Sequence, residues 1–78
     1  ENLKALLAVG PGLLKKDGFL AVISFHSLED RLVKWDFKQR QQDGVYRVLT
    51  KRPIVAGPEE VLANRRARSA KLRIAQKN

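Results

Sequence analysis

The first eighteen residues carry leucines at helical spacing, with Leu3, Leu6 and Leu7 on one face of a predicted helix. The triplet Gly10-Pro11-Gly12 is expected to interrupt this helix. Pro11 suits the start of a second short helix, because its missing N–H lies among groups that are unpaired at any helix start. An Asp-Gly pair at positions 17–18 then marks a turn. The pattern therefore predicts two short helices followed by a turn.

A short apolar run, Phe19–Phe25, follows this turn and lacks the alternation of a half-buried strand. Such a run is typical of a strand buried on both faces, as in parallel sheets that are covered by helices. Next comes a helix from about Ser27 to Gln41, with Asp43-Gly44 as its stop signal. The Ser27 hydroxyl is expected to cap this helix by accepting from the N–H of Asp30, whose side chain reaches back.

The second half of the chain predicts two more strands and one short helix. Polar and apolar residues alternate in Val45–Arg52, which predicts a strand that Pro53 ends. Gly57-Pro58 begins a short helix that runs to about Asn64, and a last alternating strand covers Ser69–Gln76. Helices and strands thus follow one another along the chain, which is the pattern of an α/β sheet.

Composition excludes several classes of protein but does not indicate a function. The chain has 78 residues, of which 44% are hydrophobic, so it is one globular domain or part of one. Without cysteine it holds no disulfide or thiolate metal site, and a single histidine cannot build a zinc site. No apolar run approaches the ~20 residues of a membrane helix, so no membrane partner is expected, and these features fit a cytoplasmic protein.

The net charge of +8 is concentrated in one half of the chain. Residues 1–45 hold seven basic and six acidic side chains, whereas residues 46–78 hold nine basic and two acidic ones. A basic half of this kind indicates a polyanionic partner such as nucleic acid, and a merely solvated basic face is the alternative. Charge alone does not separate these two interpretations.

The stretch ISFHSLEDR, Ile23–Arg31, joins the apolar strand to the following helix and contains the single histidine. Ligands of open α/β sheets bind beyond the carboxyl ends of the strands, so His26 and Ser27 are candidates for the edge of a site. The structural alternative is that Ser27 only caps the helix and that His26 is a loop residue bonded to backbone. The sequence contains no glycine-rich phosphate loop, no Gly-x-Ser-x-Gly motif and no nucleophile–base pair set by spacing.

Three stretches carry a resemblance to a known family: GFLAVISFHSLEDRLVK at 18–34, VLTKRPI at 48–54 and NRRARSAKLR at 64–73. Together they resemble the closing segment of the ribosomal RNA small subunit methyltransferase H family, also called MraW, over nearly the whole chain. The resemblance implies a class I methyltransferase with a Rossmann-like, seven-stranded doubly wound sheet. Phe19–Phe25 would be its fifth strand, and Val45–Arg52 and Ser69–Gln76 its antiparallel end.

The resemblance further implies an enzyme that uses S-adenosyl-L-methionine to methylate the exocyclic N4 of a cytosine in 16S ribosomal RNA. The family's glycine-bearing cofactor loop, acidic ribose-binding residue and Asp-Leu-Gly-Val-Ser-Ser motif do not occur in this sequence. Residues 1–78 are therefore expected to be the C-terminal fragment of a methyltransferase domain, without its cofactor-binding half and inactive alone. Small-subunit ribosomal RNA or the 30S subunit is the expected partner, and a homodimer is left open.

Two groups of residues follow as candidates for the site of such an enzyme. Cytosine N4 is a weak nucleophile, so transfer needs in-line placement and a group that accepts a hydrogen bond or a proton from the amine. His26, Ser27 and Ser24 are the candidates for that catalytic neighbourhood. The candidates for contact with RNA are the basic residues Arg31, Lys51, Arg52, Arg65, Arg66, Arg68, Lys71 and Arg73.

Alternatives remain for single residues and for the whole chain. Arg31 is equally suited to pairing with Glu29 or Asp30, and this structural pairing is slightly favoured. Trp35 and Tyr46 are able to stack on a base, but packing in the core is the favoured interpretation for both. For the whole chain, a non-catalytic basic RNA- or ribosome-binding module is the second hypothesis, and a class I methyltransferase with another target is the third.

Overall fold

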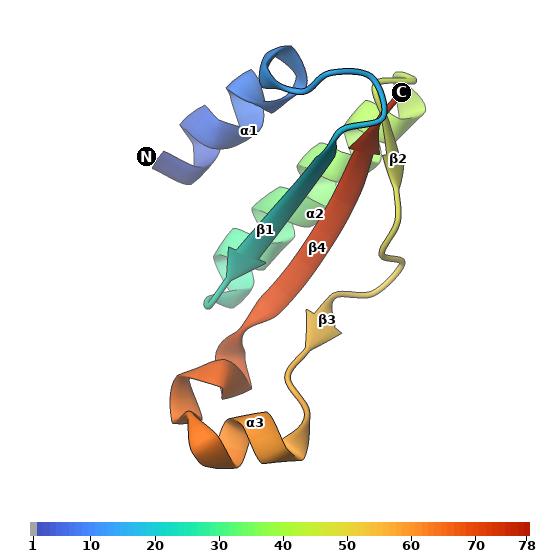
Figure 1. Cartoon of the computed structure of the whole chain (residues 1–78). Helices are drawn as coiled ribbons and strands as arrows, with labels where there is room; N and C mark the ends of the chain where they lie inside the picture. The colour runs from blue at the N-terminus through green and yellow to red at the C-terminus, as the bar shows by residue number, and fades with distance from the viewer. Residues whose placement is uncertain (1) are drawn as a thin grey trace.

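Helices and strands follow one another along residues 2–78, the part of the chain that the computed structural model describes (Figure 1). The predicted α/β class is confirmed, and two short elements, β3 and η1, are added to the predicted order. No helix in this part of the chain is long and apolar enough to cross a membrane. In chain order the elements are α1 (Asn2–Leu13), β1 (Phe19–Ser24), α2 (Ser27–Gln42), β2 (Tyr46–Val48), β3 (Ile54–Val55), α3 (Pro58–Ala63), the 3-10 helix η1 (Arg65–Ser69) and β4 (Lys71–Lys77).

β4 is the central strand of the sheet and pairs with every other strand of the described chain. The order is β1-β4-β2, and β3 pairs with β4 nearer its start. All three pairings are antiparallel, as expected for the last two long strands. β1 and β2 therefore run in the same direction on either side of β4, and α2 connects them. Ser24, at the carboxyl end of β1, lies opposite Lys71, so η1, which immediately precedes β4, lies at that end of the sheet.

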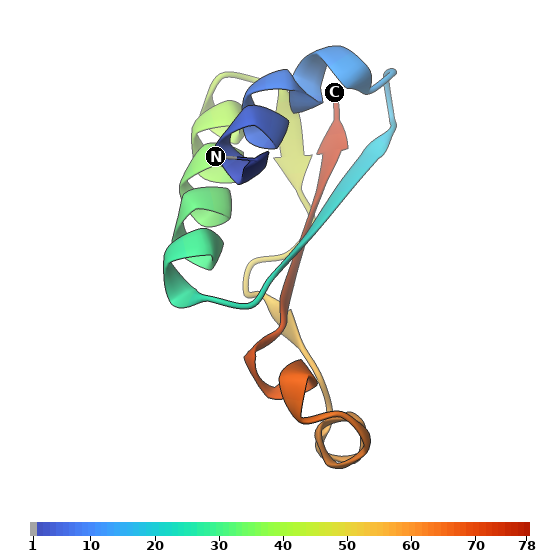
Figure 2. The same cartoon turned by 90° about the vertical axis from the view of Figure 1, so that its left-hand side faces the viewer.

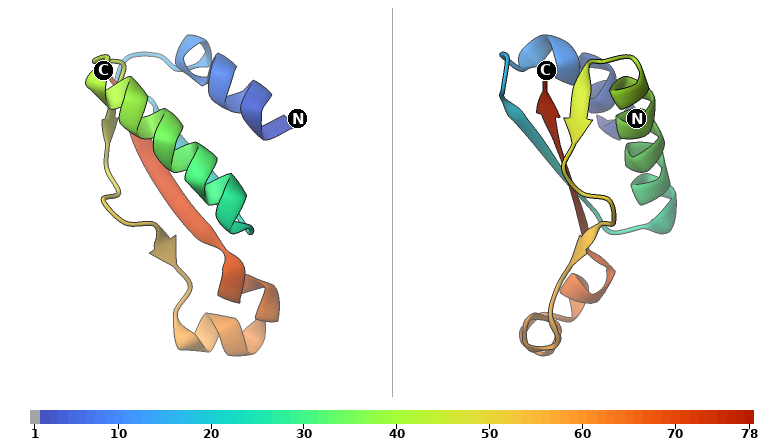
Figure 3. Two further views of the ribbon diagram at one scale, coloured as in Figure 1. Left: turned by 180° about the vertical axis from the view of Figure 1, so that it is seen from behind. Right: turned by 90° about the vertical axis from the view of Figure 1, so that its right-hand side faces the viewer.

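Both long helices lie on one side of the sheet, as the views from the side and from behind show (Figures 2 and 3). No element of residues 2–78 covers the other face, on which Phe19 and Ile23 of β1 are 61% and 59% exposed. The prediction that this strand is buried on both faces is therefore wrong for the described chain, in which β4 pairs with it in the antiparallel sense. Its inward face alone is buried, through Val22 and Ser24.

The core lies between α2 and the sheet. Phe37 of α2 meets Tyr46 of β2 edge-to-face, with ring centroids 5.7 Å apart, and neither side chain is exposed by more than 1%. Such aromatic pairs contribute about 0.5–1.5 kcal/mol beyond the area that they bury. Val33, Val22 and Ala75 complete the buried cluster together with Leu7. The prediction that Tyr46 packs in the core is confirmed.

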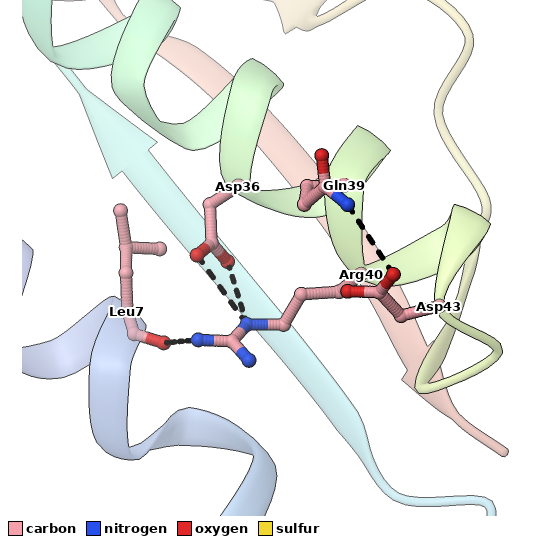
Figure 4. Close-up of polar contacts among 5 residues, drawn as sticks. All are labelled: Leu7, Asp36, Gln39, Arg40 and Asp43. Carbon is pink, nitrogen blue, oxygen red and sulfur yellow. Dashed lines mark hydrogen bonds and ion pairs between the residues drawn. The ribbon is translucent and has the colours of Figure 1, made fainter.

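α1 runs without a break through Gly10 and Pro11, so the predicted division into two helices is wrong. A proline inside a helix leaves the carbonyl four residues earlier without its N–H donor. Here that carbonyl belongs to Leu7, and Nη2 of Arg40 in α2 donates to it over 3.3 Å (Figure 4). Nε of the same guanidinium lies 3.3 Å from Oδ1 of Asp36. A distant side chain thus replaces the missing donor, which the local sequence does not reveal.

The start of α2 also differs from the expected capping box. His26 is the N-cap residue, it has an extended backbone, and its side chain makes no capping hydrogen bond. Ser27 is already the first helical residue, and Asp30 points instead to Arg73. Glu29 reaches back from the first turn, and its Oε1 accepts from the N–H of Phe25, one residue before the N-cap, over 3.4 Å. The predicted stop is confirmed, because Asp43 caps the helix and Gly44 adopts a φ of 77°.

The strand predicted over Val45–Arg52 is regular only in β2, because beyond it a side chain replaces a backbone carbonyl in the hydrogen bonds to β4. Leu49 N–H still donates to the Ile74 carbonyl over 3.0 Å. In the other direction, however, Ile74 N–H donates to the Thr50 hydroxyl over 3.2 Å rather than to a carbonyl. The chain then leaves the sheet and returns as β3. The short helix predicted after Gly57-Pro58 is confirmed as α3, and the last strand begins two residues later than predicted.

A methyl group at Gly10 tests the close approach of α1 to the core. A Cβ there would lie 2.9 Å from the Tyr46 hydroxyl oxygen and 3.2 Å from Leu20 Cδ2, whereas one at Gly12 would meet nothing within 4 Å. We expect Gly10→Ala to destabilise the protein by about 1–3 kcal/mol through overpacking. Gly12→Ala is the matched control and should leave stability equal or raise it by up to about 1 kcal/mol. Thermal unfolding measures both, and equal effects would contradict the packing argument.

Candidate functional site

The turn between β1 and α2 holds the three candidate catalytic residues within four positions of the chain. Ser24 ends β1 and is buried, on the face that is turned to α2. His26 and Ser27 are both exposed, His26 as the N-cap of α2 and Ser27 as its first residue. This turn therefore presents an imidazole and a hydroxyl to solvent at the carboxyl end of β1. The Ser24 side chain lies beneath the turn, on the buried face of the sheet.

A hollow of about 410 Å³ lies between this turn and η1, and we call it the arginine hollow. Arg66 of η1 places its guanidinium 5.8 Å from the centroid of the Phe25 ring. Asn64 caps the start of η1, because its Oδ1 accepts from the N–H of Arg66 over 3.0 Å. Two segments forty residues apart thus meet at one site. The arginine hollow is lined by Phe25, His26, Glu29, Arg66 and Ser69.

A second hollow, of about 480 Å³, lies on the other side of His26 and Glu29 and reaches Lys4 of α1. Its floor is formed by the exposed apolar side chains of α2, and Arg31 lies 6.0 Å from the centroid of the Trp35 ring. Trp35 is 59% exposed, so the prediction that it packs in the core is wrong. The favoured pairing of Arg31 with Glu29 or Asp30 is not found among residues 2–78.

Asp30 is instead paired with Arg73 of β4, and both side chains are buried. Nε of Arg73 donates to Oδ1 over 2.7 Å, and Nη2 donates to Oδ2 over 3.0 Å, which is a bidentate geometry. The hydrogen bond from Arg73 holds the pKa of Asp30 below its ordinary value, although burial opposes this. Arg73 is only 7% exposed, so its donors serve the fold and not the surface where RNA contact was expected.

The other candidate RNA contacts lie at separate places on the molecule. Arg65, Arg66 and Arg68 are exposed on η1, beside the arginine hollow, and Lys71 follows them at the start of β4. Arg52 is exposed in the bend before β3. Lys51 lies elsewhere, in a hollow of about 360 Å³ beside α2 that Lys34 and Lys38 also line. Sequence reasoning missed these two lysines, although their spacing of four places them on one helix face.

A sequence profile of the MraW methylase family matches residues 1–78. The chain belongs to the MraW methylase family. Curated relatives share about half of its residues. A protein named ribosomal RNA small subunit methyltransferase H from Acidobacterium capsulatum is 57% identical over 76 residues, which are 97% of this chain and 26% of the relative.

Two further relatives carry the same name. The one from Endomicrobium trichonymphae is 49% identical over 77 residues, covering 99% of this chain and 26% of the relative. The one from Picosynechococcus sp. is 55% identical over 76 residues, covering 97% of this chain and 25% of the relative. The chain therefore spans about a quarter of the length of the curated MraW relatives that it matches.

The described part of this MraW chain does not fit the cradle of a methyl donor such as S-adenosyl-L-methionine. Doubly wound folds hold the nucleoside part of a cofactor at a glycine-rich turn between a strand and a helix. The turn here, Phe25-His26, contains no glycine. Among residues 2–78 there is also no group of three histidine or carboxylate side chains that would hold a metal ion. The residues that the structure describes therefore provide no candidate for binding the donor.

Replacing Asp30 by asparagine tests the buried ion pair of the site. We expect Asp30→Asn to cost about 3 kcal/mol, because it leaves the Arg73 charge buried without a counter-charge. The folded pKa of Asp30 lies below 3.8, so the stabilisation is fully present above that pH and is lost as the pH falls through the folded value. The difference in thermal stability between wild type and variant should therefore shrink in strong acid.

Asp43→Asn is the matched control for this measurement, because Asp43 is an exposed carboxylate at the other end of α2. Its replacement should change stability by no more than about 0.5 kcal/mol. A pH-independent loss in Asp30→Asn would argue against the ion pair as the cause.

Proposed function

We propose that the chain is part of an S-adenosyl-L-methionine-dependent methyltransferase that modifies the N4 of a cytosine in small-subunit, 16S ribosomal RNA. The family and the names of the relatives support a methyltransferase that acts on ribosomal RNA. The observation that carries the proposal is the arginine hollow, where the polar turn after β1 meets a basic segment. A site for methyl transfer to RNA needs both, namely polar groups at a strand end and cations for phosphate.

The chain is proposed to be the closing quarter of the enzyme, with the cofactor-binding half before it. In a doubly wound fold the glycine-rich turn follows the first strand, and no such turn follows β1. The order β1-β4-β2 with an antiparallel central strand suits an end of a larger sheet. The chain alone is expected to be inactive, because nothing in it matches the donor cradle.

Within this proposal the turn after β1 positions the target base. His26 is the candidate to accept a hydrogen bond or a proton from the cytosine amine, because it is exposed and its backbone is held by α2. Ser27 presents a hydroxyl beside it, and buried Ser24 supports the turn from the core side. The target base must leave its stack to reach this turn, as in other enzymes that act on bases.

The basic residues outside the core are proposed to hold ribosomal RNA or the 30S subunit. Arg65, Arg68 and Lys71 lie beside the turn, and Arg52 and Lys51 precede β3. Arg31 lies on the other side of His26, against Trp35. Their charges attract phosphates through a salt-dependent interaction. Arg73 is left out, because its guanidinium is bound to Asp30.

A non-catalytic basic RNA- or ribosome-binding module is the second candidate function. The observation that favours it is the concentration of positive charge in residues 46–78, together with the missing donor cradle. A methyltransferase of the same class with a different target is the third. The three candidates predict different nucleosides in ribosomal RNA: N4-methylated cytidine, another methylated nucleoside, or no methylation by this protein. Nucleoside analysis of ribosomal RNA therefore separates them.

Disruption of the gene that encodes this chain should remove N4-methylated cytidine from small-subunit ribosomal RNA, as measured by nucleoside mass spectrometry. The intact gene should restore it, and a gene carrying His26→Ala should restore it at a rate lowered by about 100-fold or more, as expected for a lost general base. An unchanged nucleoside profile would support the binding module. Loss of a different methylated nucleoside would support another target.

Charge reversal at Arg65 and Arg68 tests the phosphate contacts of η1. In the full-length protein, Arg65→Glu with Arg68→Glu should weaken RNA binding and flatten its dependence on salt, by about 0.7 in the logarithmic slope for each lost contact. The control is Lys15→Glu with Lys16→Glu, an equal change of charge at the opposite end of β1. An equal effect of both double variants would mean that only net charge matters.

A further inference from the structure

Arg66 differs from the other arginines of η1 in what its guanidinium touches. It lies over the ring of Phe25 at 5.8 Å from the centroid, and it takes part in no ion pair among residues 2–78. Phe25 is 43% exposed, so the pair is open to solvent on the side of the arginine hollow. A guanidinium that lies over a ring on one side is able to stack on a second planar group on its other side.

The charges around this pair favour a base over a phosphate. Glu29 lines the same hollow, and its carboxylate is held there by the N–H of Phe25. Within the lining of the hollow the Glu29 carboxylate offsets the Arg66 charge, so phosphates are expected at the neighbouring arginines rather than at Arg66 itself. Arg65 and Arg68, exposed on the same short helix, are better placed for phosphates.

We propose that the outer face of the Arg66 guanidinium, held in place by Phe25, stacks on one unpaired base of single-stranded RNA. Protein side chains recognise unpaired RNA bases in this way, with arginine planes as well as aromatic rings. The hollow of about 410 Å³ lies within the range of small-molecule sites. Arg66 is then a base contact, Phe25 is a positioning residue, and the neighbouring arginines bind the backbone. This inference rests on the proposed RNA substrate, and it deepens that proposal by dividing the roles within η1.

The test measures how much binding depends on a base and how much on phosphates. The measurement is the affinity of the full-length protein for single-stranded oligoribonucleotides of about ten nucleotides, in which each base in turn is removed while its phosphate stays. For wild type, removal of one base should weaken binding about tenfold, as expected for one lost stack. Arg66→Lys keeps the positive charge and removes the planar guanidinium. This variant should bind the intact RNA more weakly and should no longer distinguish RNA with and without the base at that position. Its salt dependence should stay unchanged.

Two variants of Phe25 separate the stack from a loss of folding. Phe25→Tyr keeps the ring and should keep the preference for the base, whereas Phe25→Leu keeps an apolar side chain and should lose most of it. Thermal unfolding confirms that both are folded. The inference is overturned if no base removal weakens wild-type binding, or if Arg66→Lys retains the wild-type preference. Nucleoside analysis reports independently on the proposed methyl transfer. A binding result that contradicts the stacking of Arg66 on a base therefore leaves the proposed methyl transfer standing, and an unchanged nucleoside profile contradicts the methyl transfer alone.

Discussion

The buried pair of Asp30 and Arg73 is the interaction on which the arrangement of the site depends. Arg73 belongs to β4, the central strand, and lies opposite Val22 of β1 in the register. Asp30 lies in the first turn of α2. Two hydrogen bonds between them therefore connect the helix that carries His26 and Glu29 to the strand that follows η1. Desolvating two charges is costly, so the pair adds little net stability, but removal of one partner is strongly unfavourable. It determines where α2 begins relative to the sheet.

A second long-range contact serves α1 in a similar way. Pro11 leaves the Leu7 carbonyl without its helical donor, and the guanidinium of Arg40 fills that role while it also pairs with Asp36. Burial raises the pKa of Asp36 above its ordinary value, and Arg40 opposes this increase. The cost of the proline is thus compensated by a side chain from α2. The same contact ties α1 to α2 on the covered side of the sheet.

The candidate catalytic residues and the arginines of η1 lie around one end of the sheet. The turn after β1 and the start of β4 meet there because these strands are antiparallel neighbours, with Ser24 opposite Lys71. The guanidinium of Arg66 lies over the Phe25 ring across this junction. The uncovered face of the sheet is apolar around Phe19 and Ile23, which suits a chain that spans a quarter of the length of its relatives. Both features agree with the proposed position at the end of a larger sheet.

The sequence by itself determined the α/β class, the family, the stop of α2 at Asp43 and Gly44, and the position of a polar turn after the first strand. These features depend on short-range periodicity, on turn residues and on motifs that can be read locally. Only the tertiary structure decided that Arg73 is bound to Asp30, that Pro11 continues a helix, and that Arg66 lies over Phe25 while Trp35 is exposed. Each of these outcomes depends on partners more than thirty residues away or on which helix face meets the sheet. A basic residue has the same appearance in a sequence whether its counter-charge is a phosphate or a buried carboxylate, and only the packing of α2 against β4 separates the two for Arg73.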